Sequence, residues 1–183
     1  MTSRKVRTIV LAALMAALTA VATMIIRIPT PTQGYIHLGD GMVLLCGILL
    51  GPGVGAMAAG VGSMMADLIG GYMAWVPGTF AIKALTAMVG GWLYHRMAGR
   101  GLRTPVRVVL CGIPAEIVMV AGYFVYEVGL EVVMGSSMGA AAAAVVLGVP
   151  MNLVQGAAGV IVGAVLLPVL SHASAEMGAK IHT

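Results

Sequence analysis

The segment Gly34-Tyr35-Ile36-His37-Leu38-Gly39-Asp40 opens the stretch that decides the fold of this chain. Two apolar runs follow it, hinged at Gly51-Pro52-Gly53, and then come Asp67 and, further on, Lys83. Two carboxylates and a lysine therefore lie in or beside segments that are otherwise apolar enough for lipid. An ionisable group at membrane depth is costly, so it usually faces a partner, a cavity or a bound molecule. The stretch predicts a membrane protein with a buried polar site.

The composition indicates the same class of protein. The chain has 183 residues, of which 60% are hydrophobic and 9% are charged, whereas a soluble domain is about 25% charged. Because so few charges cannot cover a solvated surface, we expect a multi-pass protein of the cell membrane, with residues 1–183 forming one domain in the lipid bilayer. Cys46 and Cys111 lie in apolar runs without the spacing of a metal or redox pair, so we expect buried thiols.

The apolar runs and the proline and glycine breaks predict an all-α bundle of six transmembrane helices. The expected helices run near 8–26, 39–50, 54–71, 79–97, 105–127 and 150–170. The first run also resembles a signal peptide, but from Thr8 to Ile26 it is long enough to span a bilayer, so we expect it to be retained. We expect a polar loop over residues 28–38 and an outer loop with a short helix over residues 128–148.

The distribution of lysine and arginine predicts the orientation of the bundle. Three of these residues lie in the N-terminal tail, four in the segment 96–107 and one in the C-terminal tail, whereas Arg27 borders the other side. Since basic residues concentrate in cytoplasmic loops, we expect both termini in the cytoplasm. The net charge of +4 then follows from topology, and no nucleic-acid partner is expected.

With this orientation, polar and aromatic side chains from six segments converge on the outer half of the bundle. They suit a small-molecule pocket, which needs a few placed polar groups among apolar and aromatic surfaces. The candidate substrate-binding residues are Tyr35, Asp40, Asp67, Trp75, Lys83, Tyr123, Glu127, Asn152 and Gln155.

Several of these residues also have a purely structural interpretation. Asp67 and Lys83 can neutralise each other across neighbouring helices. Asp40 can be a helix cap, and Trp75 can belong to the aromatic belt at the membrane surface. The two amide side chains of helix 150–170 can join helices. The sequence leaves these alternatives open beside ligand contact.

Two further polar residues are not assigned to the site. Glu116 lies mid-span beyond Pro114, and we expect it to bond a freed backbone group or a neighbouring helix. His37 lies in the expected polar loop, and we expect it to be incidental.

A stripe of small residues marks one face of the first helix. Ala12, Ala16 and Ala20 repeat every four residues, so they share a face that another helix can approach closely. That helix can belong to the same bundle or to a partner protein, and the spacing alone favours neither.

Taken together, these features resemble a known family, the membrane-embedded S components of energy-coupling factor (ECF) vitamin transporters. The resemblance covers nearly the whole chain and rests on the order and spacing of the Ala12–Ala16 stripe, the 34–40 segment, Gly51-Pro52 with Gly55, Asp67 to Tyr72, Thr79 to Lys83, and Pro150 to Gly156. The chain is most similar to the branch assigned to pyridoxine-type and hydroxymethylpyrimidine-type substrates, and riboflavin-type members look similar too.

The resemblance implies a six-helix subunit that binds a water-soluble vitamin or precursor at the extracellular side. It implies that the alanine stripe docks on a T component, which two cytoplasmic ATPase subunits drive. The chain carries no Gly-x-x-x-x-Gly-Lys-Ser/Thr motif, so we expect no ATP hydrolysis by this subunit. Nor does it carry an enzyme motif, so we expect no catalytic residues, metal or cofactor. The alternative is a stand-alone secondary carrier, although we see no internal repeat that would favour one.

Overall fold

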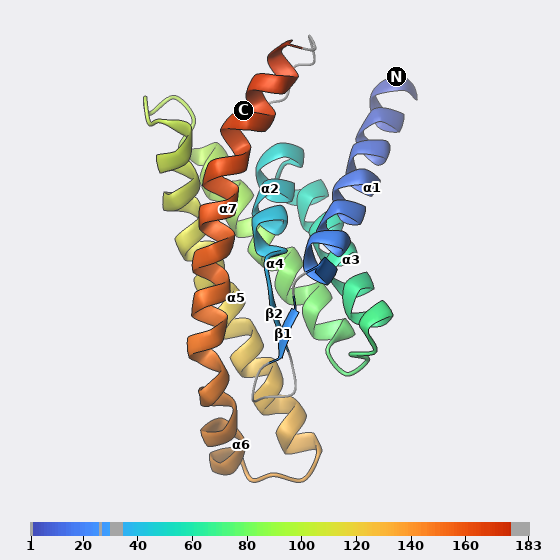
Figure 1. Cartoon of the computed structure of the whole chain (residues 1–183), viewed down its shortest axis with the longest axis vertical. Coiled ribbons are helices and arrows are strands. Elements are labelled where there is room, and N and C mark those ends of the chain that lie inside the picture. The colour runs from blue at the N-terminus through green and yellow to red at the C-terminus, as the bar shows by residue number, and fades with distance from the viewer. Residues whose placement is uncertain (1, 26, 30–34, 177–183) are drawn as a thin grey trace.

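The computed structural model describes residues 2–25, 27–29 and 35–176 as a helical bundle with one small hairpin (Figure 1). Its helices are α1 (Thr2–Ile25), α2 (Asp40–Leu50), α3 (Pro52–Gly70), α4 (Val76–Arg96), α5 (Thr104–Val133), α6 (Met138–Val145) and α7 (Val149–Glu176), with the short 3-10 turn η1 (Val146–Gly148). The expected class of mostly helical membrane protein is therefore confirmed.

The helices differ in their capacity to cross a bilayer. Five segments of the described chain are long and apolar enough to do so: Lys5–Ile25, Pro52–Gly70, Val76–Arg96, Thr104–Val133 and Met138–Ser171. Helix α2 has 11 residues, and at 1.5 Å per residue it reaches only about half of the roughly 30 Å hydrocarbon core. It is a short apolar helix enclosed by longer ones.

A β-hairpin replaces part of the loop that the sequence predicted over residues 28–38. Strand β1 (Arg27–Pro29) pairs antiparallel with β2 (Tyr35–His37), so that Ile28 lies opposite Ile36. The polar loop expected over residues 28–38 therefore contains paired backbone at these positions, where the two short segments satisfy each other's hydrogen-bonding groups. The part of that loop at residues 30–34, which includes Gln33, lies outside the described residues.

Several helix boundaries also differ from the prediction: α1 begins at Thr2 instead of near residue 8, and α4 at Val76 instead of near residue 79. Only Gly51 remains in the turn between α2 and α3, with φ of 80°, because Pro52 suits the first turn of a helix. Helix α5 continues to Val133, six residues beyond the predicted end at 127, and α7 continues to Glu176. The expected short helix within 128–148 is present as α6.

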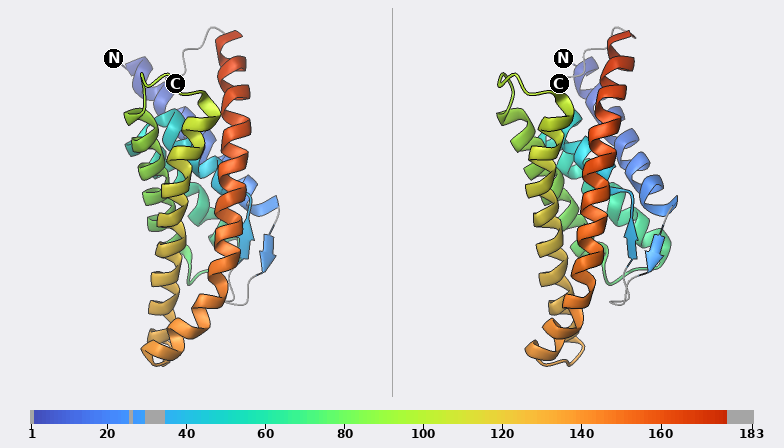
Figure 2. Two further views of the ribbon diagram at one scale, coloured as in Figure 1. Left: turned by 90° about the vertical axis from the view of Figure 1, so that its left-hand side faces the viewer. Right: turned by 60° about the vertical axis from the view of Figure 1, so that its left-hand side comes forward.

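Helix α2 occupies the middle of the bundle. It packs against α1, α3, α4 and α7, while α3 pairs with α4 and α5 pairs with α7. Figures 1 and 2 show that α1 begins and α7 ends at the same end of the molecule as the loop joining α4 to α5, while α6 lies at the opposite end. The core includes Val43, Leu45 and Ile48 of α2, all fully buried.

Glycine allows α2 and α4 to cross in backbone contact. A Cβ atom on Gly47 of α2 would meet the carbonyl oxygen of Ala87, and one on Gly91 of α4 would meet the carbonyl oxygen of Gly47. Cys46, beside this crossing, and Cys111 in α5 are buried free thiols, as expected. The crossing fixes α4, which carries part of the site, against the central helix.

Candidate functional site

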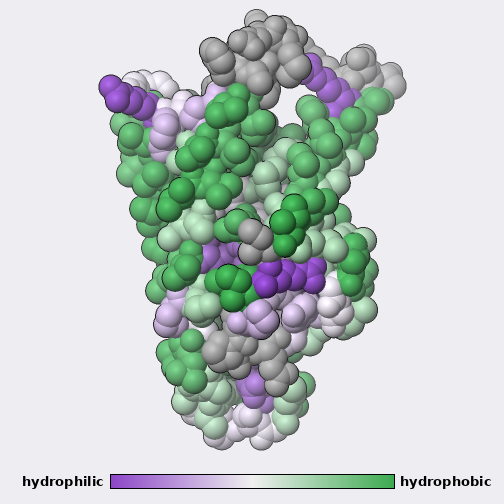
Figure 3. Space-filling model, in the orientation of Figure 1, coloured by the Kyte–Doolittle hydropathy of each residue, from purple (hydrophilic) through white to green (hydrophobic). Residues whose placement is uncertain are grey.

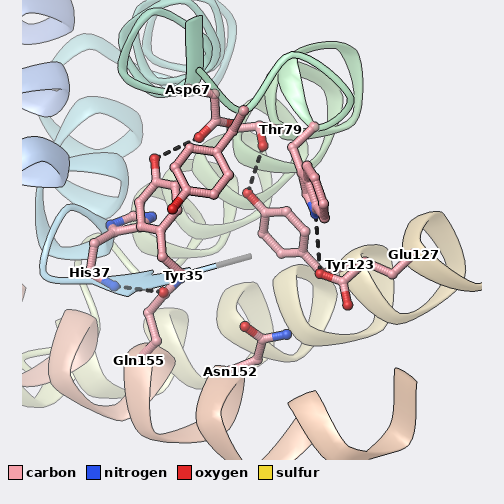
Figure 4. Close-up of a pocket in the computed structure, with 10 residues that line it drawn as sticks. Tyr35, His37, Asp67, Thr79, Tyr123, Glu127, Asn152 and Gln155 are labelled. Carbon is pink, nitrogen blue, oxygen red and sulfur yellow. Dashed lines mark hydrogen bonds between the residues drawn. The ribbon is translucent and has the colours of Figure 1, made fainter. Parts of the chain in front are cut away.

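A pocket is formed where β2, the start of α4 and the end of α5 meet (Figure 4). In Figure 1 these segments lie in the half of the bundle away from the end where α1 begins. The pocket is bounded by β2, by α3 and the turn after it, and by α4, α5 and α7. The residues that line it are Tyr35, His37, Asp67, Tyr72, Trp75, Thr79, Tyr123, Glu127, Asn152 and Gln155. Seven of the nine predicted binding residues are in this set, and Asp40 and Lys83 are not.

Aromatic rings form one wall of the pocket. The ring centroids of Tyr35 and Tyr72 are 4.6 Å apart, and those of Tyr72 and Trp75 are 6.1 Å apart in an edge-on arrangement. The indole N–H of Trp75 donates to Glu127 Oε1 at 3.4 Å. These contacts hold flat apolar surfaces beside polar groups, which is an arrangement that suits a heteroaromatic ligand.

Asp67 is held by a tyrosine rather than by a lysine. The Tyr35 hydroxyl donates to Asp67 Oδ1 at 2.6 Å. Burial and the adjacent carboxylate raise the pKa of Tyr35 well above its usual range, so the phenol keeps its proton and remains the donor. The predicted alternative of an Asp67–Lys83 pair was wrong, because Lys83 turns to a different carboxylate.

That carboxylate belongs to Asp40, at the start of α2. Lys83 Nζ donates to Asp40 Oδ1, and neither side chain is exposed. The second oxygen of Asp40 accepts a hydrogen bond from Gln155 Nε2 at 2.6 Å. The Asp40 side chain makes no capping hydrogen bond at the start of α2; it joins α2 to α4 and α7 behind the pocket instead.

Gln155 connects this buried network to the hairpin. Its Oε1 accepts from the backbone N–H of His37 at 2.9 Å, while its Nε2 donates to Asp40. Both ends of the amide are thus engaged by the protein (Figure 4 shows the bond to the hairpin). Gln155 fixes β2 against α7, and the wall of the pocket depends on it.

His37 is part of the site, contrary to the expectation that it is incidental. It is buried, and its Nδ1 accepts from the backbone N–H of Gly39 at 2.9 Å. Burial, together with the positive charge of Lys83, lowers the pKa of His37 to about 3. The imidazole is therefore neutral at pH 7.

Sequence reasoning also missed Thr79 as a lining residue. The hydroxyl groups of Thr79 and Tyr123 lie 3.0 Å apart, within hydrogen-bond distance. A signal was present, since Thr79 lies four residues before Lys83 and therefore shares its helix face. Asn152, which was predicted, extends its amide from α7 toward the pocket on the side of Tyr123 (Figure 4).

Glu116 behaves differently from the prediction. It is buried, and within the described chain neither of its carboxyl oxygens has a hydrogen-bond partner. It packs against Gly156 and Gly159 of α7 rather than bonding a freed backbone group. The sequence around Glu116 did not indicate that its carboxyl group would lack a hydrogen-bond partner in the described chain. That outcome depends on which face of α5 packs against the glycines of α7.

The alanine stripe lies along the contact between α1 and α3. Ala12, Ala16 and Ala20 are half-buried, and a Cβ atom on Gly62 of α3 would meet the Ala16 carbonyl oxygen. Close packing within the bundle, which the spacing left open, therefore accounts for part of the stripe. Ala17, on the neighbouring face, is exposed.

The side chains that line the pocket suit the binding of a small molecule. Among the residues that the structure describes, no group of three or more histidine, cysteine or carboxylate side chains is placed to hold a metal ion. The arrangement offers aromatic faces, neutral hydroxyl and amide groups and carboxylates. Such a set is typical of pockets that bind a small polar molecule.

The chain belongs to the family of S components of ECF-type riboflavin transporters, whose family model matches residues 3–172. This match confirms the family that the sequence predicted, which is a family of transporter subunits. The chain is also similar to a Pyrococcus woesei protein described as "Uncharacterized protein in gap 3'region", with 42% identity over 104 residues. The matched region covers 56% of this chain and 66% of that relative, so the chain spans just under two thirds of the relative's length.

Proposed function

We propose that this chain binds a water-soluble, ring-containing vitamin or vitamin precursor in the pocket of Figure 4 and delivers it across the cell membrane with a T component and two ATPase subunits. The observation that carries this proposal is the convergence of stacked aromatic rings with Asp67, Glu127 and Asn152 in one pocket of a chain of this family. Pyridoxine-type and hydroxymethylpyrimidine-type compounds are the leading candidates from the sequence. Riboflavin is the alternative, supported by the description of the matching family.

The charge distribution supports an orientation with the pocket facing outward. Lys5, Arg7, Arg96, Arg100 and Arg103 are exposed at the end of the bundle where α1 begins and α4 meets α5. The face drawn in Figure 3 is hydrophobic over most of its upper half, with hydrophilic residues near the upper edge and across the middle. Since basic residues concentrate on the cytoplasmic side, we assign that end to the cytoplasm and the pocket to the outer half.

Replacing Asn152 by alanine is expected to weaken vitamin binding about tenfold or more, because losing one hydrogen bond to a buried ligand group costs about 1–3 kcal/mol. Isothermal titration of the purified chain with pyridoxine, hydroxymethylpyrimidine and riboflavin measures this. The matched control is Leu153→Ala, because Leu153 is the next residue along α7, is exposed, and does not line the pocket. Equal affinities for the two variants would remove Asn152 from the binding site.

We also propose that α1 docks on the T component. The predicted docking residues were Ala12, Ala16 and Ala20, and their half-buried position makes the adjoining exposed face, with Leu14, Ala17 and Val21, the accessible part of this surface. Small and apolar side chains there let a partner helix approach without a polar group to satisfy.

A bulky residue at position 17 is expected to separate docking from ligand binding. Ala17→Trp should leave ligand affinity of the isolated chain unchanged, abolish uptake in cells and stop co-purification with the T component. Ala16→Trp is the contrasting variant: it should destabilise the isolated chain, because Ala16 lies against Gly62 of α3. Normal uptake by the Ala17→Trp variant would exclude this face of α1 as the docking surface.

A further inference from the structure

The charged side chains that line the pocket are all acidic among the described residues. Two carboxylates, Asp67 and Glu127, contribute to the lining, and no lysine or arginine does so among the described residues. The remaining polar side chains there are hydroxyl, amide, indole and imidazole groups. The pocket therefore supplies acceptors and neutral donors to a ligand.

The nearest basic side chains, Lys83 and Arg27, do not line the pocket. Lys83 is fully buried against Asp40, behind the lining. Arg27 donates to the carbonyl oxygen of Ala66 at 3.1 Å and lies 4.9 Å from the ring centroid of Tyr35. His37, which does line the pocket, is neutral because its pKa is lowered to about 3. A negatively charged ligand would therefore find no cation among the described residues that line this pocket.

The carboxyl group of Asp67 is a buried hydrogen-bond acceptor at one end of the pocket. Asp67 is 4% exposed. Its Oδ1 accepts from Tyr35. Its Oδ2 is buried and makes no hydrogen bond of good geometry among the described residues, although the Thr79 hydroxyl interacts with this carboxyl group. A buried carboxylate oxygen is costly to leave unmatched, so this atom suits a donor brought by the ligand. Glu127 lies across the pocket from it, oriented by the Trp75 indole.

We infer that the pocket selects an unphosphorylated heteroaromatic molecule that presents N–H or O–H donors, or a positive charge, to Asp67 and Glu127. This inference rests on the proposed function and narrows it. A phosphate ester carries a charge of about −1.5 to −2 at pH 7 and adds only acceptor oxygens. Buried beside two carboxylates, it would meet like charge and no donor cation.

Matched pairs of ligands test the inference on the purified 183-residue chain in detergent. The pairs are pyridoxine with its 5'-phosphate, hydroxymethylpyrimidine with its monophosphate, and riboflavin with flavin mononucleotide, each titrated by calorimetry. In any pair that binds, we expect the phosphate ester to bind at least about a hundredfold more weakly than its parent. An ester that binds as tightly as its parent would overturn this inference and leave the proposed function standing. Failure of all six compounds to bind would instead overturn the proposed function.

A charge-neutral variant tests the physical cause. Glu127→Gln should bring the dissociation constant of the phosphate ester closer to that of its parent compound. The substitution removes one of the repelling charges and preserves the shape of the side chain. The control is Glu131→Gln, one turn further along α5, whose carboxylate accepts from Ser136 at 3.1 Å and does not line the pocket. That variant should keep the ratio of the two dissociation constants unchanged. An unaltered ratio in Glu127→Gln would overturn the assignment of selectivity to this carboxylate.

Discussion

Lys83→Met is expected to lower the free energy of unfolding by about 3–5 kcal/mol, because it leaves the buried charge of Asp40 without its partner. Both side chains are fully buried and joined as an ion pair. Ligand affinity should fall as well, because Asp40 is hydrogen-bonded to Gln155, which is hydrogen-bonded to the backbone of His37 at the pocket. Unfolding in mixed micelles by detergent titration, followed by helical circular dichroism, measures the change.

A double-mutant cycle supplies the control for this prediction. Asp40→Asn removes the charge but keeps a side-chain oxygen that can accept from Gln155. The double variant Asp40→Asn with Lys83→Met should therefore be more stable than Lys83→Met alone, since no buried charge is then unpaired. If the two single losses simply add in the double variant, the ion pair does not hold the centre of the bundle together.

The second large effect is expected at the crossing of α2 and α4. Gly47→Val should cost about 3 kcal/mol or more, because its branched side chain would enter the space taken by the backbone of Ala87. Flexible side chains can move aside, whereas two helix backbones in contact can separate only if the helices part. Since α4 carries Thr79 and Lys83, ligand affinity should fall together with stability. The same unfolding measurement and a ligand titration report both effects.

The matched control for Gly47 is another helical glycine. Gly129 of α5 has no atom within 4 Å of the place where its Cβ would be, and Gly129→Val should leave the free energy of unfolding nearly unchanged or slightly raised, because glycine is a poor helix former. A Gly47→Val variant as stable as Gly129→Val would mean that α2 and α4 do not cross in contact.

The sequence by itself determined the class of protein and the approximate place of each long helix. Apolar runs bounded by proline and glycine can form stable structure in lipid only as helices, because a helix satisfies its own backbone groups. The depth of a residue then follows from its position along a helix. For that reason, the gathering of Asp67, Tyr123, Glu127 and Asn152 in one half of the bundle could be predicted from residue number.

Only the tertiary structure decided which of these groups meet. Position along a helix gives depth, but it does not give rotation about the helix axis, and rotation is set by contacts such as Gly47 against α4. Lys83 therefore pairs with Asp40 instead of Asp67, although all three were predicted near one another. The hairpin that brings Tyr35 to Asp67 could not be predicted from the sequence either. Strands this short have no periodic signal of their own, and a neighbouring surface must hold them in register.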